Sequence, residues 1–226
     1  MAVGPEGAYR ALLASYGPQG WWPARTRFEM VAGAMLMAQT SWPRVEEALS
    51  ALRRDRRLSA AGIARCPMPR LRALVRPAGL HSMKPRRLRG MAREILRAGG
   101  LDRLLSGDTA EVRSRLLSLE GVGEETADSI LLYAGHRPVF VVDAYTRRLG
   151  ARLGWFHGGS YGDVQAWFHR RLPRDTALLN EVHALIVTHG KARCRPRPRC
   201  RGCPLLARCP HGRAQVYPAH RPSTRG

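Results

Sequence analysis

The chain has 226 residues, enough for one large domain or two small ones, each with its own core. Its 38 Lys and Arg outnumber its 17 Asp and Glu, and the formal net charge of +21 predicts a polyanionic partner, most simply nucleic acid. A compositional drift toward arginine is the alternative source of that charge. With no membrane-spanning apolar run and no signal peptide, we expect a cytoplasmic protein.

Helical periodicity recurs along most of the chain, and it predicts an all-α fold. The predicted helices, in chain order, are 28–40, 43–54, 84–100, 108–119, GEETADSILLYAG, DAYTRRLGARLGW, YGDVQAWFHRRL and TALLNEVHALIVTHG. The first is apolar almost all round, which indicates a buried helix. Asp108 or Thr109 is the expected N-cap of the fourth. The run PVFVVD is strand-like but has no partner run, and residues 211–226 are predicted to form a disordered basic tail.

Four cysteines close together near the C-terminus suggest a metal centre. They are spaced C-x5-C-x2-C-x5-C, at Cys194, Cys200, Cys203 and Cys209. A structural zinc ribbon normally holds two close pairs well apart, whereas four thiolates in one loop suit a [4Fe-4S] cluster. Zinc and unligated thiols remain alternatives. Cys66 stands alone and is expected to be a packed core side chain.

Two glycines, Gly121 and Gly123, lie between two predicted helices. This is a helix-hairpin-helix arrangement, which we place at residues 119–131. Glycines there allow close backbone approach, and their amides, with those of the next helix, can bind phosphate without reading sequence. Asp143 ends the apolar PVFVV run and opens the next helix, so it is expected to be an N-cap that stays ionised. Such a carboxylate suits stabilisation of an oxocarbenium ion during N-glycosidic cleavage.

The order G-V-G, helix, V-V-D, C-x5-C-x2-C-x5-C resembles the endonuclease III superfamily of helix-hairpin-helix (HhH-GPD) DNA glycosylases over roughly residues 20 to 210. The resemblance implies a six-helix barrel domain (25–137) and a second helical domain carrying the [4Fe-4S] loop (1–24 and 138–210). It also implies a double-stranded DNA partner with a damaged base flipped out of the helix. We expect a monomer.

The resemblance also assigns roles to individual residues. Asp143 becomes the catalytic carboxylate, and Gly121 and Gly123 hold the DNA backbone. Gln39 falls where a polar wedge fills the space left by the flipped nucleotide, and Leu80, in AGLHSMK, is placed to intercalate from the other side. A helix-end amide for Gln39 and ordinary packing for Leu80 are the alternatives.

Bifunctional members of the superfamily carry a lysine two residues after the second glycine, where this chain has Glu125. Glutamate cannot form the Schiff base through which a lysine cuts the strand. We therefore expect a monofunctional glycosylase that uses water, with doubtful AP-lyase activity. A displaced lyase lysine, Lys191 in THGKARC, is the minority alternative.

Trp21, Trp22 and Trp42 surround the first long predicted helix, a pattern similar to the 3-methyladenine DNA glycosylase branch, in which aromatic rings stack on an alkylated purine. Stacking on tryptophan favours an electron-poor base. Packing of the N-terminal tryptophans against the barrel is the alternative. Three further hypotheses remain open: a bifunctional glycosylase for oxidised pyrimidines, a damage-binding homologue without efficient catalysis, and a zinc-stabilised DNA-binding module.

Overall fold

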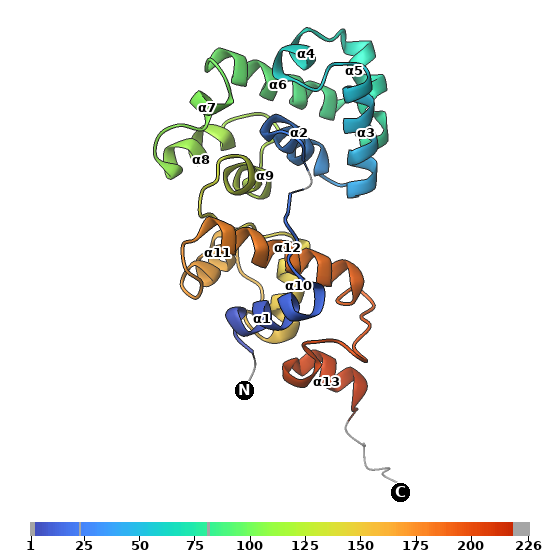
Figure 1. Ribbon diagram of the computed structural model, residues 1–226, viewed down its shortest axis with the longest axis vertical. Coiled ribbons are helices and arrows are strands. Elements are labelled where there is room, and N and C mark those ends of the chain that lie inside the picture. Colours follow the sequence, from blue (N-terminus) through green and yellow to red (C-terminus); the bar gives the residue numbers. More distant parts are fainter. Residues whose placement is uncertain (1–2, 23, 81, 219–226) are drawn as a thin grey trace, which may run out of the picture. The chain divides into compact units, whose positions relative to one another are not determined.

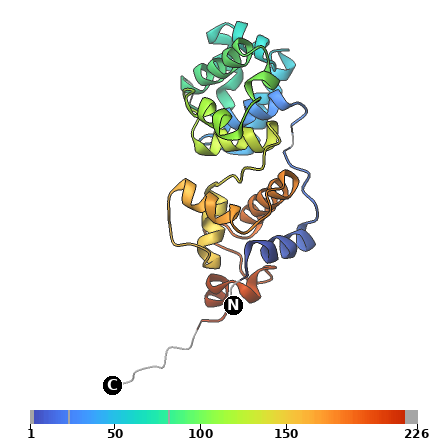
Figure 2. The ribbon, with the colours of Figure 1, turned by 90° about the vertical axis from the view of Figure 1, so that its left-hand side faces the viewer.

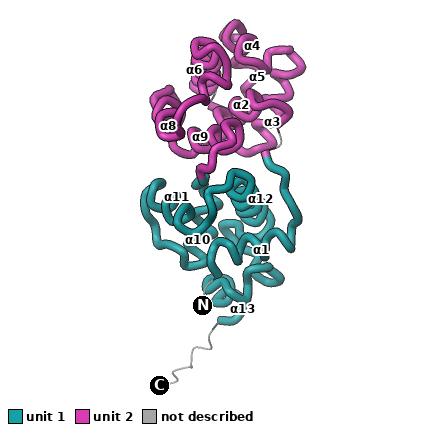
Figure 3. Tube along the Cα trace, turned by 60° about the vertical axis from the view of Figure 1, so that its left-hand side comes forward, with its two compact units in different colours: residues 1–21, 140–226 teal, residues 22–139 magenta. Residues whose placement is uncertain are grey.

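The computed structural model describes residues 3–22, 24–80 and 82–218, and every described element is a helix, as predicted (Figure 1). The chain divides into two compact units, one of residues 22–139 and the other of residues 1–21 with 140–226 (Figure 3). Among the described residues, no helix is long and apolar enough to cross a membrane.

The unit of residues 22–139 is built around one helix that is buried on nearly every side. Its helices are α2 (Arg27–Met37), α3 (Trp42–Arg54), α4 (Ala60–Arg65), α5 (Met68–Val75), α6 (Met83–Arg97), α7 (Leu101–Leu104), α8 (Thr109–Leu117) and α9 (Glu124–Ser129), with a 3-10 turn η1 (Arg76–Ala78) and a π-helical stretch η2 (Ile130–Ala134). Helix α2 packs against α3, α6, α9 and η2, and every residue from Glu29 to Leu36 is buried. The prediction of a core helix here is confirmed.

The second unit joins the N-terminal helix to the C-terminal half of the chain. It contains α1 (Pro5–Tyr16), α10 (Ala144–Leu153), α11 (Tyr161–His169), α12 (Thr176–Ala192), a 3-10 turn η3 (Leu206–Arg208) and α13 (Pro210–Val216). Helix α12 packs against both α1 and α10, so segments far apart in sequence share one core (Figures 1 and 2).

The strand-like PVFVVD run is extended but pairs with no strand in the described part of the chain. Side chains of α11 satisfy its backbone instead. The Phe140 amide donates to His169 Nε2 at 2.9 Å, Gln165 Nε2 donates to the Phe140 carbonyl at 2.7 Å, and the Val142 amide donates to Tyr161 Oη at 3.2 Å. These bonds replace a sheet ladder and allow a lone extended segment to be buried.

The tail prediction is partly wrong, because its first residues belong to helix α13. The helix begins after Cys209, whose Sγ accepts from the Gly212 amide at 3.3 Å, and Pro210 fits its first turn. The cysteine loop therefore supplies the cap that tail composition alone does not reveal. Residues 219–226 of the predicted tail lie outside the described residues.

Candidate active site

Asp143 is the N-cap of α10, as expected from the sequence. Its Oδ1 accepts a hydrogen bond of 2.7 Å from the Thr146 amide, and its side chain is 12% exposed. The preceding residues Val141 and Val142 are buried. The carboxylate is thus fixed at the end of an apolar segment, with one oxygen engaged by the helix and a limited opening to solvent.

Opposing effects act on the charge of this carboxylate. Burial on its own would raise the pKa of Asp143, but the nearby His183 imidazole and the Thr146 hydrogen bonds bring that pKa below its usual value of 3.8. His183 Nε2 lies 3.6 Å from Asp143 Oδ2, within ion-pair distance when the imidazole is protonated. Asp143 is therefore ionised at neutral pH, as its N-cap position predicts.

Trp21 and Lys191 lie in the same unit, around the His183 and Asp143 pair. The Trp21 ring stacks on His183 with centroids 6.1 Å apart, and Lys191 Nζ lies 5.4 Å from the Trp21 centroid. Burial lowers the pKa of Lys191, and the negative charge of Asp143 opposes this shift. The carboxylate, the imidazole, the indole and the amine thus form one cluster.

The other two tryptophans of the predicted base pocket lie in the other unit. Trp22 meets Trp42 edge-on at 5.1 Å and Tyr133 at 5.2 Å. Both indoles pack beside Gly33 of α2, where an added Cβ would lie 3.5 Å from Trp42 and 3.7 Å from Trp22, an ordinary van der Waals distance. The structure therefore brings Trp22 and Trp42 together and gives Trp21 different neighbours.

The hairpin glycines separate α8 from α9, and both are exposed. Gly121 has φ +81°, a conformation that favours glycine, whereas Gly123, the N-cap of α9, has an ordinary φ of −92° and open space around it. Arg113 Nε of α8 donates to the fully buried Asp128 of α9 at 2.7 Å and ties the two helices together.

Both predicted wedge residues adopt a left-handed backbone conformation that is uncommon outside glycine. Gln39 follows α2 with φ 53° and is exposed, and Leu80 follows η1 with φ 46° and is half-buried. Such a conformation costs on the order of 1 kcal/mol and concentrates at functional positions. The Lys84 ammonium, 1% exposed, donates to the Ala78 carbonyl at 2.6 Å and holds the start of the Leu80 loop.

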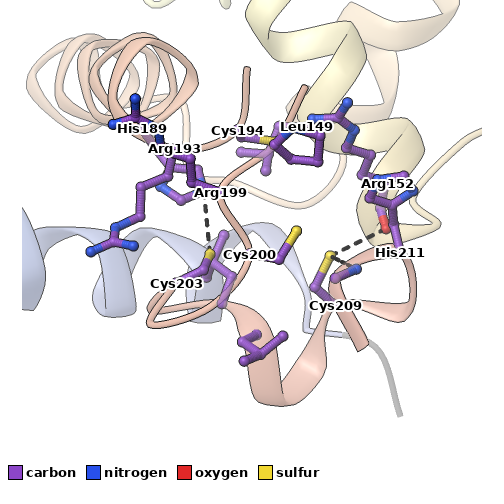
Figure 4. Close-up of a pocket in the computed structure, with 14 residues that line it drawn as sticks. Leu149, Arg152, His189, Arg193, Cys194, Arg199, Cys200, Cys203, Cys209 and His211 are labelled. Carbon is purple, nitrogen blue, oxygen red and sulfur yellow. Dashed lines mark hydrogen bonds between the residues drawn. The ribbon is translucent and has the colours of Figure 1, made fainter. Parts of the chain in front are cut away.

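All four C-terminal cysteines line one pocket, shown in Figure 4. Arg152 Nη1 donates to Cys194 Sγ at 3.3 Å, and Cys203 Sγ lies 3.7 Å from His189 Nε2, whose Nδ1 meets Tyr16 Oη at 2.9 Å. Burial lowers the pKa of His189 to about 4, with a further contribution from Arg193. The pocket is thus lined by sulfur, guanidinium and neutral imidazole.

The thiols also influence one another. Burial raises the pKa of Cys203 and of Cys209, and the charges of neighbouring cysteines add to both shifts. A bound cationic centre would remove this penalty, since metals bind thiolates. Within the described ranges, no three His, Cys, Asp or Glu side chains converge as ligands of a single metal ion.

A family model describing the HhH-GPD superfamily of base excision DNA repair proteins matches residues 32–174. The chain belongs to this superfamily. It is a DNA repair glycosylase of the HhH-GPD and endonuclease III group. Among its relatives is a protein of Methanocaldococcus jannaschii, provisionally named a DNA repair glycosylase, with 42% identity over 89% of this chain and 93% of the relative. Endonuclease III of Sulfolobus acidocaldarius is 35% identical over 60% of this chain and 59% of its own.

Solved structures bear out the HhH-GPD fold. The H. pylori 3-methyladenine DNA glycosylase MagIII, bound to 1,N6-ethenoadenine, has a TM-score of 0.74 and 26% identity, covering 84% of this chain and 98% of its own. An endonuclease III in a non-covalent DNA complex has a TM-score of 0.80 over 95% of this chain and 99% of its own; at 21% identity that likeness shows the fold alone.

His183 was not among the residues predicted from the sequence, and Lys191 was only a minority alternative there. Both lie on α12, which also carries His189, and only folding brings them next to Asp143, 40 residues or more earlier in the chain. No local motif marks His183. For Lys191 a sequence signal existed, because it is one of only two lysines among the 38 Lys and Arg of the chain.

Proposed function

We propose that this HhH-GPD protein removes damaged bases from double-stranded DNA by hydrolysing the N-glycosidic bond, with Asp143 as its catalytic carboxylate. The observation that carries the proposal is the fixed, ionised Asp143 side chain at the start of α10, partly open to solvent. As the bond to the base breaks, positive charge develops on the deoxyribose, and a carboxylate held in a low-polarity setting stabilises it. Water then completes the reaction at C1′.

The base must leave the duplex before it can reach such a site. We propose that the hairpin of Gly121 and Gly123 binds backbone phosphates through the first amides of α9, while Gln39 and Leu80 enter the space left by the flipped nucleotide. Their left-handed backbone presents both side chains on tight turns after helices. The net charge of +21 supplies the general attraction for DNA and predicts binding that weakens steeply with salt.

For the substrate, we propose an alkylated purine. Support comes from the aromatic faces of Trp21, Trp22 and Trp42, which suit stacking on an electron-poor base, and from the likeness to MagIII. An alkylated purine also has a weakened glycosidic bond, so a site that grips the base and stabilises the sugar cation suffices. Oxidised pyrimidines are the competing substrate class.

Base release in this proposal needs no amine in the hairpin. Glu125 occupies the position where bifunctional relatives carry lysine, and it is exposed in the first turn of α9. A carboxylate there cannot form an imine. The hairpin therefore supplies no lyase amine, and the proposed enzyme is a monofunctional glycosylase that uses water as the nucleophile.

We propose that Cys194, Cys200, Cys203 and Cys209 hold a [4Fe-4S] cluster. Each iron of such a cluster takes one thiolate, so its four ligands surround a larger body than a single ion, which suits cysteines that share a pocket without converging on one point. The Arg152 contact fits an anionic, metal-bound set, whereas the raised pKa of Cys203 and Cys209 means that thiolates there need a cationic centre to offset burial and mutual repulsion. The cluster's contribution is structural: it fixes the arginine-rich loop between α12 and α13.

The test is base release from duplexes that carry either methylated purines or oxidised pyrimidines. We expect free methylated purine and an abasic product that breaks only after alkali, from a preparation with the visible absorbance of an iron–sulfur cluster. Preferential release of oxidised pyrimidine would assign the other substrate class. Tight binding to damaged DNA without release of any base would make the protein a damage-binding homologue, and a colourless, zinc-containing protein would overturn the cluster.

A further inference from the structure

A chain of polar contacts runs from the N-terminal helix α1 into the cysteine pocket. At its centre is His189 of α12, which is only 1% exposed. Its Nε2 lies 3.7 Å from Cys203 Sγ, inside the pocket (Figure 4), and its Nδ1 lies 2.9 Å from the hydroxyl oxygen of Tyr16. Tyr16 is the last residue of α1, 173 positions earlier in the sequence. The imidazole therefore connects the N-terminal helix to a cysteine of the pocket.

Arg193 stands at the outer end of this chain of contacts. Burial raises the pKa of Tyr16, and the charge of Arg193 and its hydrogen bond with the Tyr16 side chain oppose that shift. The same guanidinium donates from Nη1 to the Arg201 carbonyl at 3.0 Å, which anchors it to the cysteine loop. Because a guanidinium has donors and no acceptor, the Tyr16 oxygen must accept from it, and the Tyr16 proton is left for His189 Nδ1.

The other end of the chain fixes the same direction. A thiolate that binds metal has no proton, so Cys203 Sγ can only accept. In a neutral imidazole, the nitrogen that accepts leaves the ring proton on the other nitrogen. His189 that accepts from Tyr16 at Nδ1 thus donates its Nε2 proton to the sulfur. The order is Arg193 to Tyr16 to His189 to Cys203, since arginine cannot accept and the thiolate cannot donate.

The imidazole differs from the other donors to the pocket sulfurs. Cys194 accepts from the Arg152 guanidinium and Cys209 accepts from a main-chain amide, and neither donor can change its protons. The imidazole proton can occupy either nitrogen, so Nε2 becomes an acceptor when the proton moves to Nδ1. The Tyr16 hydroxyl prevents this exchange by occupying Nδ1 as a donor.

We propose that Tyr16 and His189 form a positioning relay that presents an N–H donor to Cys203, raising the reduction potential of the iron–sulfur cluster and slowing its loss. Hydrogen bonds to the sulfurs are one means by which a protein sets this potential, because they stabilise the more negative, reduced form. The inference rests on the proposed cluster and gives the N-terminal helix a part in tuning it. Tyr16 acts through His189.

The experiment uses the whole cluster-loaded protein and two readouts: the reduction potential by film voltammetry, and the rate at which an iron chelator removes the visible absorbance. Tyr16→Phe deletes only the hydroxyl. It should lower the reduction potential and make cluster loss about 10-fold faster. Tyr9→Phe, on the same helix and outside the relay, is the matched control and should change neither readout.

Substitutions of His189 separate hydrogen bonding from packing. His189→Leu has no donor and should lower the potential at least as far as Tyr16→Phe does. His189→Gln carries an amide N–H that can reach the sulfur without help from Tyr16, so it should restore most of the potential. Tyr16→Phe added to His189→Gln should then have no further effect, because the amide has no second position for its protons. Thermal melting verifies that each variant is folded.

Each result decides the relay separately from the other proposals. An unchanged potential in folded, cluster-loaded Tyr16→Phe and His189→Leu would overturn the relay and leave the cluster proposal intact. Equal shifts from Tyr16→Phe in the wild-type and His189→Gln backgrounds would mean that Tyr16 acts by packing, which also contradicts the relay. A wild-type protein without an iron–sulfur chromophore would remove both relay and cluster. Base release, assayed in parallel, decides the excision proposal on its own.

Discussion

Helices α9 and α10 begin in opposite ways, and the contrast separates two tasks. Helix α9 starts at Gly123, which has no side chain to cap it, so its N-cap leaves room for an outside acceptor. Helix α10 starts at Asp143, which accepts from Thr146 and remains ionised. The first start suits binding of a DNA phosphate from outside the protein, whereas the second carries its own anion.

The surroundings of the two helix starts also differ: the start of α9 is exposed, whereas the start of α10 is largely buried. Gly123 is exposed with open space where a Cβ would lie, so DNA can approach its backbone. Asp143 follows buried valines and lies beside His183, so its charge is fixed and partly shielded from water. Both residues are helix N-caps, but we propose that Gly123 leaves the helix amides to a DNA phosphate, whereas Asp143 supplies the catalytic carboxylate.

The substitution Gly123→Ala tests the proposed phosphate contact at the start of α9, and its expected effect is larger than that of the capping variant described next. The ordinary φ and open surroundings of Gly123 accept a methyl group, so stability should change little. The methyl group would stand between the amides and a phosphate, and loss of one charge-assisted hydrogen bond should weaken DNA binding about 10-fold. Fluorescence anisotropy with damaged and undamaged duplexes should show equal losses for both; unchanged affinity would remove the hairpin from the interface.

The substitution Asp108→Ala tests whether an aspartate N-cap matters only for helix stability, and its expected effect is smaller. Asp108 caps α8 through a 2.7 Å bond from the Ala110 amide, but it is exposed and distant in sequence from any proposed site residue except the hairpin. Loss of an ordinary cap should lower the free energy of unfolding by about 1 kcal/mol and leave base release intact. Denaturant unfolding beside a base-release assay checks this, and a large loss of activity would show that capping alone explains the importance of such aspartates.

Much of the fold was predictable because helical periodicity, caps and glycine stops are local signals. The buried α2, the caps at Asp108 and Asp143, and the burial of Cys66 follow from residue order alone. Helices α1, α4, α5, α7 and α13 were missed; all but α1 are short, and short helices depend on tertiary packing more than on their own pattern.

The site was predictable only where a motif marks it. Asp143 follows a recognisable apolar run, and the cysteines have a telling spacing, whereas His183 reaches Asp143 through the packing of α12 on α10. The separation of Trp21 from Trp22 was equally invisible, because adjacent residues on an extended segment can have wholly different neighbours. Local order thus predicts elements, and folding decides which side chains meet.

The most direct measurement is the single-turnover rate of methylated purine release by Asp143→Asn beside wild type. Asparagine caps a helix as well as aspartate does, so the variant should fold with nearly unchanged stability while it loses only the negative charge. Without that charge the sugar cation is unsupported, and we expect the rate to fall at least about 100-fold. A folded Asp143→Asn protein that releases base as fast as wild type would contradict the role of this carboxylate.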